Sequence, residues 1–204
     1  IKEEKGRDVE VACIGPAGEN LVRIAVIQHE IENAAGQGGF GAVMGAKNLK
    51  AVAVKGSGGV GIAKPDAFME ACEYVRKIAY APGSGCESPR LSPQHEPERR
   101  SSPKACTMSC GSHCLQIHRT VKGEVVGLEC CSASYMSLKP QEAALEAALA
   151  ANKYGLNHWE IVNGFRGTQG WLPKCEKADV LTDEDFEMPF EPLNADFWIG
   201  LLHK

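Results

Sequence analysis

The sequence lacks a long apolar run. No window approaches about 18 consecutive apolar residues, so it predicts no transmembrane helix. Its first residues, IKEEKGRDVEVACIGP, contain no basic stretch followed by an apolar one, and therefore no signal peptide is expected. Basic residues are not in excess either, because 22 Lys and Arg stand against 26 Asp and Glu. Since binding to nucleic acid needs clustered positive charge, we expect no binding to nucleic acid. Without an expected signal peptide or transmembrane helix, the expected location is the cytoplasm.

The composition nevertheless supports a folded core. With 204 residues, 44% of them hydrophobic, the chain has room for one domain or for pieces of two, and it is not disordered. It does not begin with methionine, and its last residues, DFWIGLLHK, end within an expected helix. We therefore expect an internal fragment of a longer protein.

Hydrophobic periodicity and the placement of Gly and Pro predict an α+β fold. The expected strands are 9–14, 21–27 and 49–54, with a helix as the alternative for 21–27. The expected helices are 66–81, 140–155, 157–177 with an interruption, and a last one from Asp196. Residues 82–105 are expected to form a loop, and 182–185 a turn or a helix start. Residues 1–62 are predicted as the β-rich end of one domain and residues 63–204 as the first part of a mostly helical domain.

A glycine-rich stretch, AAGQGGFGAVMGAKNLKAVAVKG, follows the second expected strand. Glycines weaken helices and strands, so their density needs a reason. One interpretation is a backbone that approaches an anion closely through its N–H groups. The other is that the glycines serve tight turns and close packing.

Nine cysteines without a signal peptide make a poor disulfide framework, because the number is odd. Cys106, Cys110 and Cys114 are clustered, as is typical of metal-binding thiols. Three local thiolates with a remote fourth are a common way to hold a [4Fe–4S] cluster. A zinc site completed by His113 or His118, or three buried free thiols, are the alternatives.

Two further features have a structural and a functional interpretation. Cys130 and Cys131 are adjacent, so their side chains diverge: one of them ligates a metal, or both form a buried pair. The stretch from Asn152 to Asn157 is typical of a helix C-terminus with Gly155 in the C′ position. The isolated histidines are interpreted as surface or satisfied residues and the tryptophans as core: His29, His95, His158, His203, Trp159, Trp171 and Trp198.

Taken together, the residues from Ile14 to Gly56 resemble the aldehyde ferredoxin oxidoreductase family, the tungsten-bispterin enzymes of anaerobes. The resemblance implies that this region closes a β-rich base under the cofactor. Backbone near Ala34, Ala35 and Gly36 would then help to bind the cofactor's phosphates and a bridging magnesium. Gln37 stands where the family usually has Arg, which removes one phosphate contact.

The same resemblance extends to the cysteine triplet and to the helix end. The family carries Cys-x2-Cys-x3-Cys for its [4Fe–4S] cluster, and here the first gap is one residue longer. The fourth ligand would lie beyond Lys204. The family's Asp-x-x-Gly-Leu-Asp motif, which binds pterin, matches at Gly155 and Leu156, whereas Asn152 and Asn157 replace both aspartates. An amide still donates and accepts hydrogen bonds, but it supplies no charge.

The stretch GEVVGLECC resembles a Gly-Glu…Gly-x-Glu pattern of these enzymes. Cys131 falls where they carry a glutamate beside the tungsten, and a thiolate there would be a metal ligand. This substitution resembles the tungsten-dependent benzoyl-CoA reductase branch. It implies that Cys131, rather than Cys130, is the catalytic metal ligand.

The resemblance therefore implies an oxidoreductase with tungsten-bispterin (or molybdenum), a [4Fe–4S] cluster and magnesium. Low-potential reduction of an aromatic acyl-CoA is favoured by Cys131, and oxidation of an aldehyde to a carboxylic acid is the alternative. A non-catalytic electron-transfer or metal-binding module is the alternative of another class. The implied partners are ferredoxin or an electron-transfer subunit and the rest of the same chain, without which the fragment is expected to be inactive.

Overall fold

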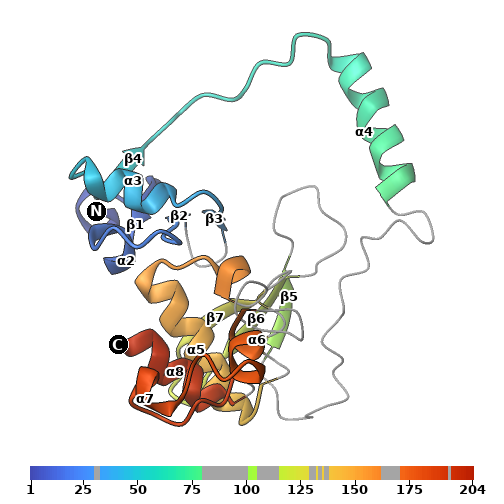
Figure 1. The fold of residues 1–204 in the computed structure, drawn as a ribbon. Coiled ribbons are helices and arrows are strands. Elements are labelled where there is room, and N and C mark those ends of the chain that lie inside the picture. The colour runs from blue at the N-terminus through green and yellow to red at the C-terminus, as the bar shows by residue number, and fades with distance from the viewer. Residues whose placement is uncertain are drawn as a thin grey trace.

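A computed structural model describes residues 1–29, 33–79, 101–104, 115–128, 132, 135, 138–161, 171–192 and 194–204. Helices and antiparallel sheets occur together, which confirms the predicted α+β class (Figure 1). The helices are α1 Lys2–Lys5, α2 Pro16–Glu19, α3 Phe40–Ala46, α4 Pro65–Ala79, α5 Gln141–Tyr154, α6 Trp171–Lys177, α7 Asp183–Phe186 and α8 Ala195–His203. The strands are β1 Glu10–Ile14, β2 Ile27–His29, β3 Asn33–Ala35, β4 Ala51–Val54, β5 Ser101–Lys104, β6 Leu115–Arg119 and β7 Val125–Leu128. None of the described helices is long and apolar enough to span a bilayer.

The N-terminal part is a four-stranded antiparallel sheet in the order β3-β2-β1-β4. The strands predicted at 9–14 and 49–54 are confirmed as β1 and β4. The strand predicted at 21–27 is wrong, because β2 begins only at Ile27. Residues 24–26 instead bond to the C-terminal part of the chain, a long-range pairing that local sequence does not reveal.

The glycine-rich stretch forms helix α3, which packs on α2 and on residues 25–26. A Cβ atom on Gly41 would lie 2.5 Å from the Val26 carbonyl oxygen, and one on Gly45 would lie 1.9 Å from the Gly18 oxygen. Real Cβ atoms do not approach so closely, so these glycines allow the backbones to pack against each other. For them the close-packing interpretation holds.

Helix α4 stands apart from both sheets and follows the exposed residues 55–64 (Figure 1). It confirms the helix predicted at 66–81 as far as Ala79, the last described residue before the gap. Phe68, Cys72 and Val75 recur at helical spacing on one side of it. Phe68 and Val75 are about half exposed, at 50% and 56%. The apolar side of α4 is therefore largely uncovered by the rest of the described structure.

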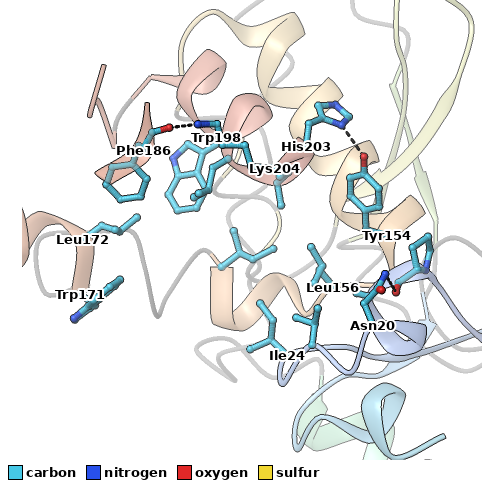
Figure 2. A pocket seen from close by; sticks show the side chains of 16 residues that line it. Asn20, Ile24, Tyr154, Leu156, Trp171, Leu172, Phe186, Trp198, His203 and Lys204 are labelled. Atoms are coloured by element: carbon cyan, nitrogen blue, oxygen red, sulfur yellow. Dashed lines mark hydrogen bonds between the residues drawn. The ribbon is translucent and has the colours of Figure 1, made fainter. Parts of the chain in front are cut away.

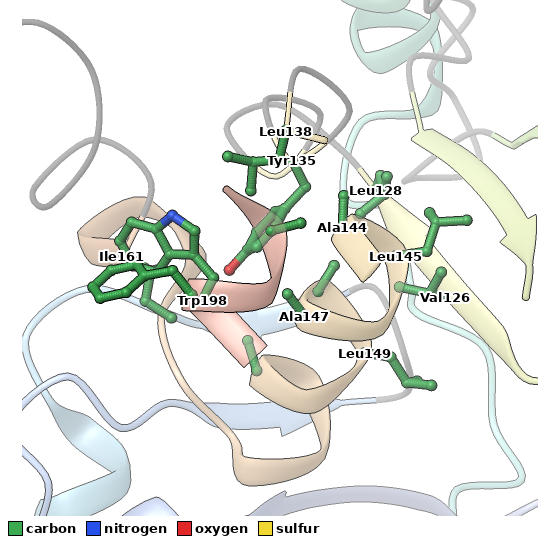
Figure 3. Close-up of a cluster of buried hydrophobic side chains, with 14 of the residues drawn as sticks. Val126, Leu128, Tyr135, Leu138, Ala144, Leu145, Ala147, Leu149, Ile161 and Trp198 are labelled. Atoms are coloured by element: carbon green, nitrogen blue, oxygen red, sulfur yellow. The ribbon is translucent and has the colours of Figure 1, made fainter. Parts of the chain in front are cut away.

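The C-terminal part packs α5 and α8 together beside a three-stranded antiparallel sheet, β5-β6-β7. Its buried core surrounds Trp198, whose indole N–H donates to the Pro192 carbonyl at 2.8 Å (Figure 3). Small alanine side chains along α5 are fully buried, which lets α8 approach. The predicted end of α5 is confirmed, since Gly155 takes the left-handed conformation at φ 74°.

The two parts meet along a seam formed by Gly15, residues 24–26 and residues 155–157. The Val26 amide donates to the Gly155 carbonyl at 2.9 Å, and the Asn157 amide donates to the Ile24 carbonyl at 2.9 Å. Gly15 contacts the end of α5 so closely that a Cβ there would lie 2.4 Å from the Tyr154 oxygen. The end of α5, whose sequence resembles a pterin-binding motif, is therefore the place where the C-terminal part joins the N-terminal part.

Candidate cofactor site

The first predicted contacts, Ala34, Ala35 and Gly36, lie at the end of β3 and directly after it. Ala34 and Ala35 are exposed and pair with β2 through Gln28 and Ile27. Gly36 faces the second predicted segment, because a Cβ built on it would lie 3.6 Å from Asn157 Oδ1. Two segments about 120 residues apart in the sequence are thus brought together.

Asn157 is buried at the seam, with 4% of its surface exposed. Its side-chain Oδ1 accepts a hydrogen bond from the Trp159 amide at 2.9 Å, which begins the next helical turn. Leu156 beside it forms an isolated β-bridge with Ala25. Gly155, Leu156 and Asn157 are therefore held mainly through their backbone.

Asn152 lines a cavity of about 730 Å³ between the sheet and α5. Cys13 and Gln28 border it from the sheet, and Lys50 and Lys153 lie at its edge. Each of these lysines is paired with a carboxylate. The wall of the cavity is mainly apolar with a few polar side chains, and Gly15 of the seam contributes to it.

His158 is an element of the site that the sequence analysis missed. Its Nε2 lies 2.7 Å from Asn152 Oδ1, and the edge of its ring packs against Tyr135 with the ring centres 5.4 Å apart. Burial lowers the pKa of His158 from 6.5 to about 4, so the ring is neutral at pH 7. The only local signal was its place immediately after the Gly155–Asn157 motif.

The cysteines singled out from the sequence, Cys106, Cys110, Cys114, Cys130 and Cys131, lie outside the described residues. The described free cysteines, Cys13, Cys72 and Cys175, are not clustered, and the described ranges contain no group of metal-ligating side chains. The metal-site predictions therefore stay predictions.

The three-stranded sheet nevertheless places the ends of both cysteine-bearing segments. Lys104, the last residue of β5, pairs with Leu115, the first residue of β6. Leu128, the last residue of β7, pairs with Gln116. Segments 105–114 and 129–131 therefore both begin at the same end of this sheet.

A second, mainly apolar pocket of about 580 Å³ lies on the other side of the seam (Figure 2). Leu156, Trp171 and Trp198 contribute to its wall, and Tyr154 hydrogen-bonds His203 at 2.7 Å on its rim. Trp171 is 55% exposed here, so the prediction that it belongs to the core is wrong. The same holds for Trp159, at 49%, whereas Trp198 is buried as predicted.

Comparison with known proteins gives a family, relatives and a fold. The family model described as aldehyde ferredoxin oxidoreductase, N-terminal domain, matches residues 1–56. The tungsten-containing aldehyde ferredoxin oxidoreductase of Pyrococcus furiosus is 50% identical over 92 residues, which cover 44% of this chain and 15% of that protein. The aliphatic sulfonate oxidoreductase, WOR-like subunit, of the same organism is 64% identical over 45 residues, 22% of this chain and 7% of that one. These matches span only a small part of the relatives' length.

Among solved structures, the active-site complex BamBC of benzoyl coenzyme A reductase, in complex with 1,5-dienoyl-CoA, has the same fold. The TM-score is 0.70 at 22% identity, over 98% of this chain and 37% of that chain. At this identity the likeness shows the fold alone. The resemblance of residues 14–56 is thus confirmed: this part of the chain is similar to the N-terminal domain of the aldehyde ferredoxin oxidoreductase family.

Proposed function

We propose that this chain is part of a tungsten–pterin, iron–sulfur oxidoreductase that carries out low-potential, two-electron chemistry. The observation that carries the proposal is that Gly36, directly after β3, lies beside Asn157 at the end of α5, while Asn152 of the same helix end lines the neighbouring cavity. The family match at residues 1–56 and the tungsten-containing relatives support the same cofactor. When bound, such a group supplies the transfer of electron pairs.

The residues present fit a polar, phosphate-bearing cofactor. Ala34 and Ala35 are exposed and Gly36 is partly exposed at the end of β3, where their backbone would bind phosphate and magnesium. Asn152 and Asn157 would hydrogen-bond the pterin through neutral amides. Residues 1–62 would form the end of the base domain and residues 63–204 the start of the helical domain.

Cys106, Cys110 and Cys114 would hold a [4Fe–4S] cluster that passes electrons singly to ferredoxin or an electron-transfer subunit. The pairing of Lys104 with Leu115 supports this, because it brings together the two residues that flank the stretch containing all three thiols. Replacing one ligand should release iron.

The iron test compares Cys110→Ala with Cys72→Ala in the complete natural polypeptide that contains these residues. We expect the first variant to lose most of its iron and acid-labile sulfide under anaerobic purification. The second lacks a thiol on α4, outside the triplet, and should keep its iron. Unchanged iron in Cys110→Ala would exclude the triplet as the cluster site.

The proposed substrate is an aromatic acyl-CoA, because Cys131 stands where a carboxylate would serve aldehyde chemistry. Aldehyde oxidation needs an acid or base near the carbonyl, and a buried carboxylate suits that task. A metal-bound thiolate is deprotonated and cannot carry a proton. The fold shared with the benzoyl coenzyme A reductase complex is consistent with this choice.

Aldehyde oxidation is the second candidate, and the identity to relatives named aldehyde ferredoxin oxidoreductases favours it. X-ray absorption at the tungsten edge of the complete protein separates the two. Two dithiolenes contribute a fixed number of sulfur neighbours, and a cysteine ligand adds one more. We expect Cys131→Ser to lose that sulfur and the matched control Cys130→Ser to keep it.

The other outcomes are equally informative. Loss only in Cys130→Ser would shift the ligand by one residue. No loss in either variant would move aldehyde oxidation ahead. A complete protein with iron but without tungsten and pterin would be an electron-transfer module.

A further inference from the structure

Asn152 and His158 form a pair whose hydrogen bonding is incomplete. His158 Nε2 and Asn152 Oδ1 are 2.7 Å apart, which satisfies one atom of each side chain. The other two polar atoms, Asn152 Nδ2 and His158 Nδ1, are buried and have no hydrogen-bond partner in the described structure. One short contact thus joins two half-satisfied side chains.

The chemistry of the pair does not depend on how the protons are assigned. If Nε2–H donates to the Asn152 oxygen, the amide N–H₂ is left as a donor and Nδ1 as an acceptor. If the amide is turned over and donates to Nε2, the amide oxygen is left as an acceptor and Nδ1–H as a donor. Either way, a neutral pair retains one unused donor and one unused acceptor.

Leaving such atoms buried is costly. An unpaired buried donor or acceptor has lost its hydrogen bonds to water without a replacement, and native proteins seldom leave one without a reason. Asn152 is one of the residues that line the 730 Å³ cavity beside the seam, so the pair lies next to space that a ligand could occupy. The missing partner is therefore expected from that ligand.

The position of the pair is fixed from several sides. Tyr135, itself 1% exposed, meets the His158 ring edge-on at an interplanar angle of 82°. Asn157 immediately before it bonds the Trp159 amide and the Ile24 carbonyl. Asn152 lies in the last turn of α5, which Gly155 terminates. Neither side chain can move far without disturbing this packing.

We propose that Asn152 and His158 act as one neutral hydrogen-bonding pair that receives a ligand edge with one acceptor and one donor, and that His158 is the positioning residue for the Asn152 amide. The inference rests on the proposed function, in which the ligand is the pterin, whose fused heterocycle offers such an edge. The inference adds His158 to the site. It also explains how the Asn152 amide serves where the family motif has an aspartate, because His158 orients that amide.

The test measures pterin per protein chain in the complete natural polypeptide, by fluorescence of the oxidised pterin. The variants are His158→Phe, His158→Gln, Asn152→Leu and the double variant Asn152→Leu/His158→Phe. Iron content and melting temperature are measured on the same samples, since a general folding defect would lower both. Gln is the conservative variant, because its terminal amide can still bond Asn152.

We expect His158→Phe and Asn152→Leu each to lower pterin content about tenfold, the effect of one lost hydrogen bond of about 1.4 kcal/mol. His158→Gln should retain more pterin than His158→Phe. The double variant should be no worse than either single variant, because the pair acts as a unit. Iron content and melting temperature should stay close to those of the wild type.

Several results would overturn the inference. Full pterin content in His158→Phe would show that the histidine does not position the amide. Losses that multiply in the double variant would show two independent residues. A parallel fall in pterin, iron and melting temperature would assign His158 a structural role only. A wild-type protein without pterin would overturn the proposed function itself, which distinguishes that failure from the others.

Discussion

Burial decides the charge of His158. Its pKa is lowered from 6.5 to about 4, because transfer of an imidazolium out of water is unfavourable. In the unfolded chain the ring takes up a proton near pH 6.5, whereas in the folded chain it does so only near pH 4. Between these values the unfolded state binds more protons, so acid favours unfolding.

We therefore predict that the free energy of unfolding falls as the pH is lowered from 6.5 to 4, and that His158 accounts for part of the fall. The contribution is at most roughly 3 kcal/mol, since each pKa unit corresponds to about 1.4 kcal/mol. Urea denaturation of the complete protein and of His158→Gln, between pH 7 and pH 4, checks this. The variant should lose less stability over that range; identical profiles would mean that His158 is charged in the folded state.

At the scale of elements, the glycines around α3 separate into two kinds. Gly39 has a left-handed φ of 67°, and a Cβ on it would lie 2.4 Å from the Arg23 carbonyl oxygen. It is needed for the fold. Gly36 has no such restraint, because a Cβ built on it would come no closer than 3.6 Å to another residue, at Asn157 Oδ1. If a glycine is required at position 36, the reason is therefore the approach of a cofactor and not the packing of the fold.

We predict that Gly39→Ala destabilises the protein by about 2 kcal/mol, through strain and overpacking. Gly36→Val should leave the melting temperature nearly unchanged but lower the pterin content. Gly56→Val is the matched control for added bulk, because a Cβ built on Gly56 would have no other residue within 4 Å apart from its chain neighbours. Full pterin content in Gly36→Val would show that no cofactor passes close to that residue.

The sequence predicts those helices whose first and last residues are marked by nearby capping residues, proline or glycine. Helix α5 is delimited by Pro140 and Gly155, and α7 begins at the capping box of Thr182. Helix α3 was missed because its glycines, which weaken an isolated helix, are needed for contact with another segment. Strand β5, which lies in residues predicted as a loop, and strands β6 and β7 were not predicted, because strands of four or five residues depend on pairing with one another more than on local sequence.

In the candidate site, too, some residues could be found from local sequence and others depend on long-range packing. Asn152 and Asn157 could be found from their resemblance to a motif, since they flank Gly155 at fixed spacing. His158 could not, because its burial and its pairing with Asn152 depend on the packing of Tyr135. An isolated histidine in a sequence carries no sign of either.

For the whole molecule, the seam is the feature on which the candidate site depends. It joins the two parts through the amides of Val26 and Asn157 and through the close contact of Gly15 with Tyr154. A side chain at Gly15 would push the end of α5 away from the sheet. The cavity beside Asn152, which Gly15 also lines, would change with it.

We predict that Gly15→Ala destabilises the complete protein by about 1–3 kcal/mol and speeds hydrogen exchange at the amides of Val26 and Asn157. Gly58→Ala is the matched control, because nothing lies within 4 Å of that residue. Exchange measured by mass spectrometry or NMR would localise the effect. Unaltered exchange at both amides in Gly15→Ala would mean that the two parts do not depend on this contact.

The seam also bears on how such a chain can change over evolutionary time. Its hydrogen bonds join peptide groups, which every pair of relatives shares, and its closest contact requires only glycine at positions 15 and 155. A recombination event that exchanged everything after residue 62 for the corresponding part of a distant relative would keep this joint intact. The C-terminal part of the chain could therefore diverge in sequence while the four-stranded sheet that it joins stayed as it was.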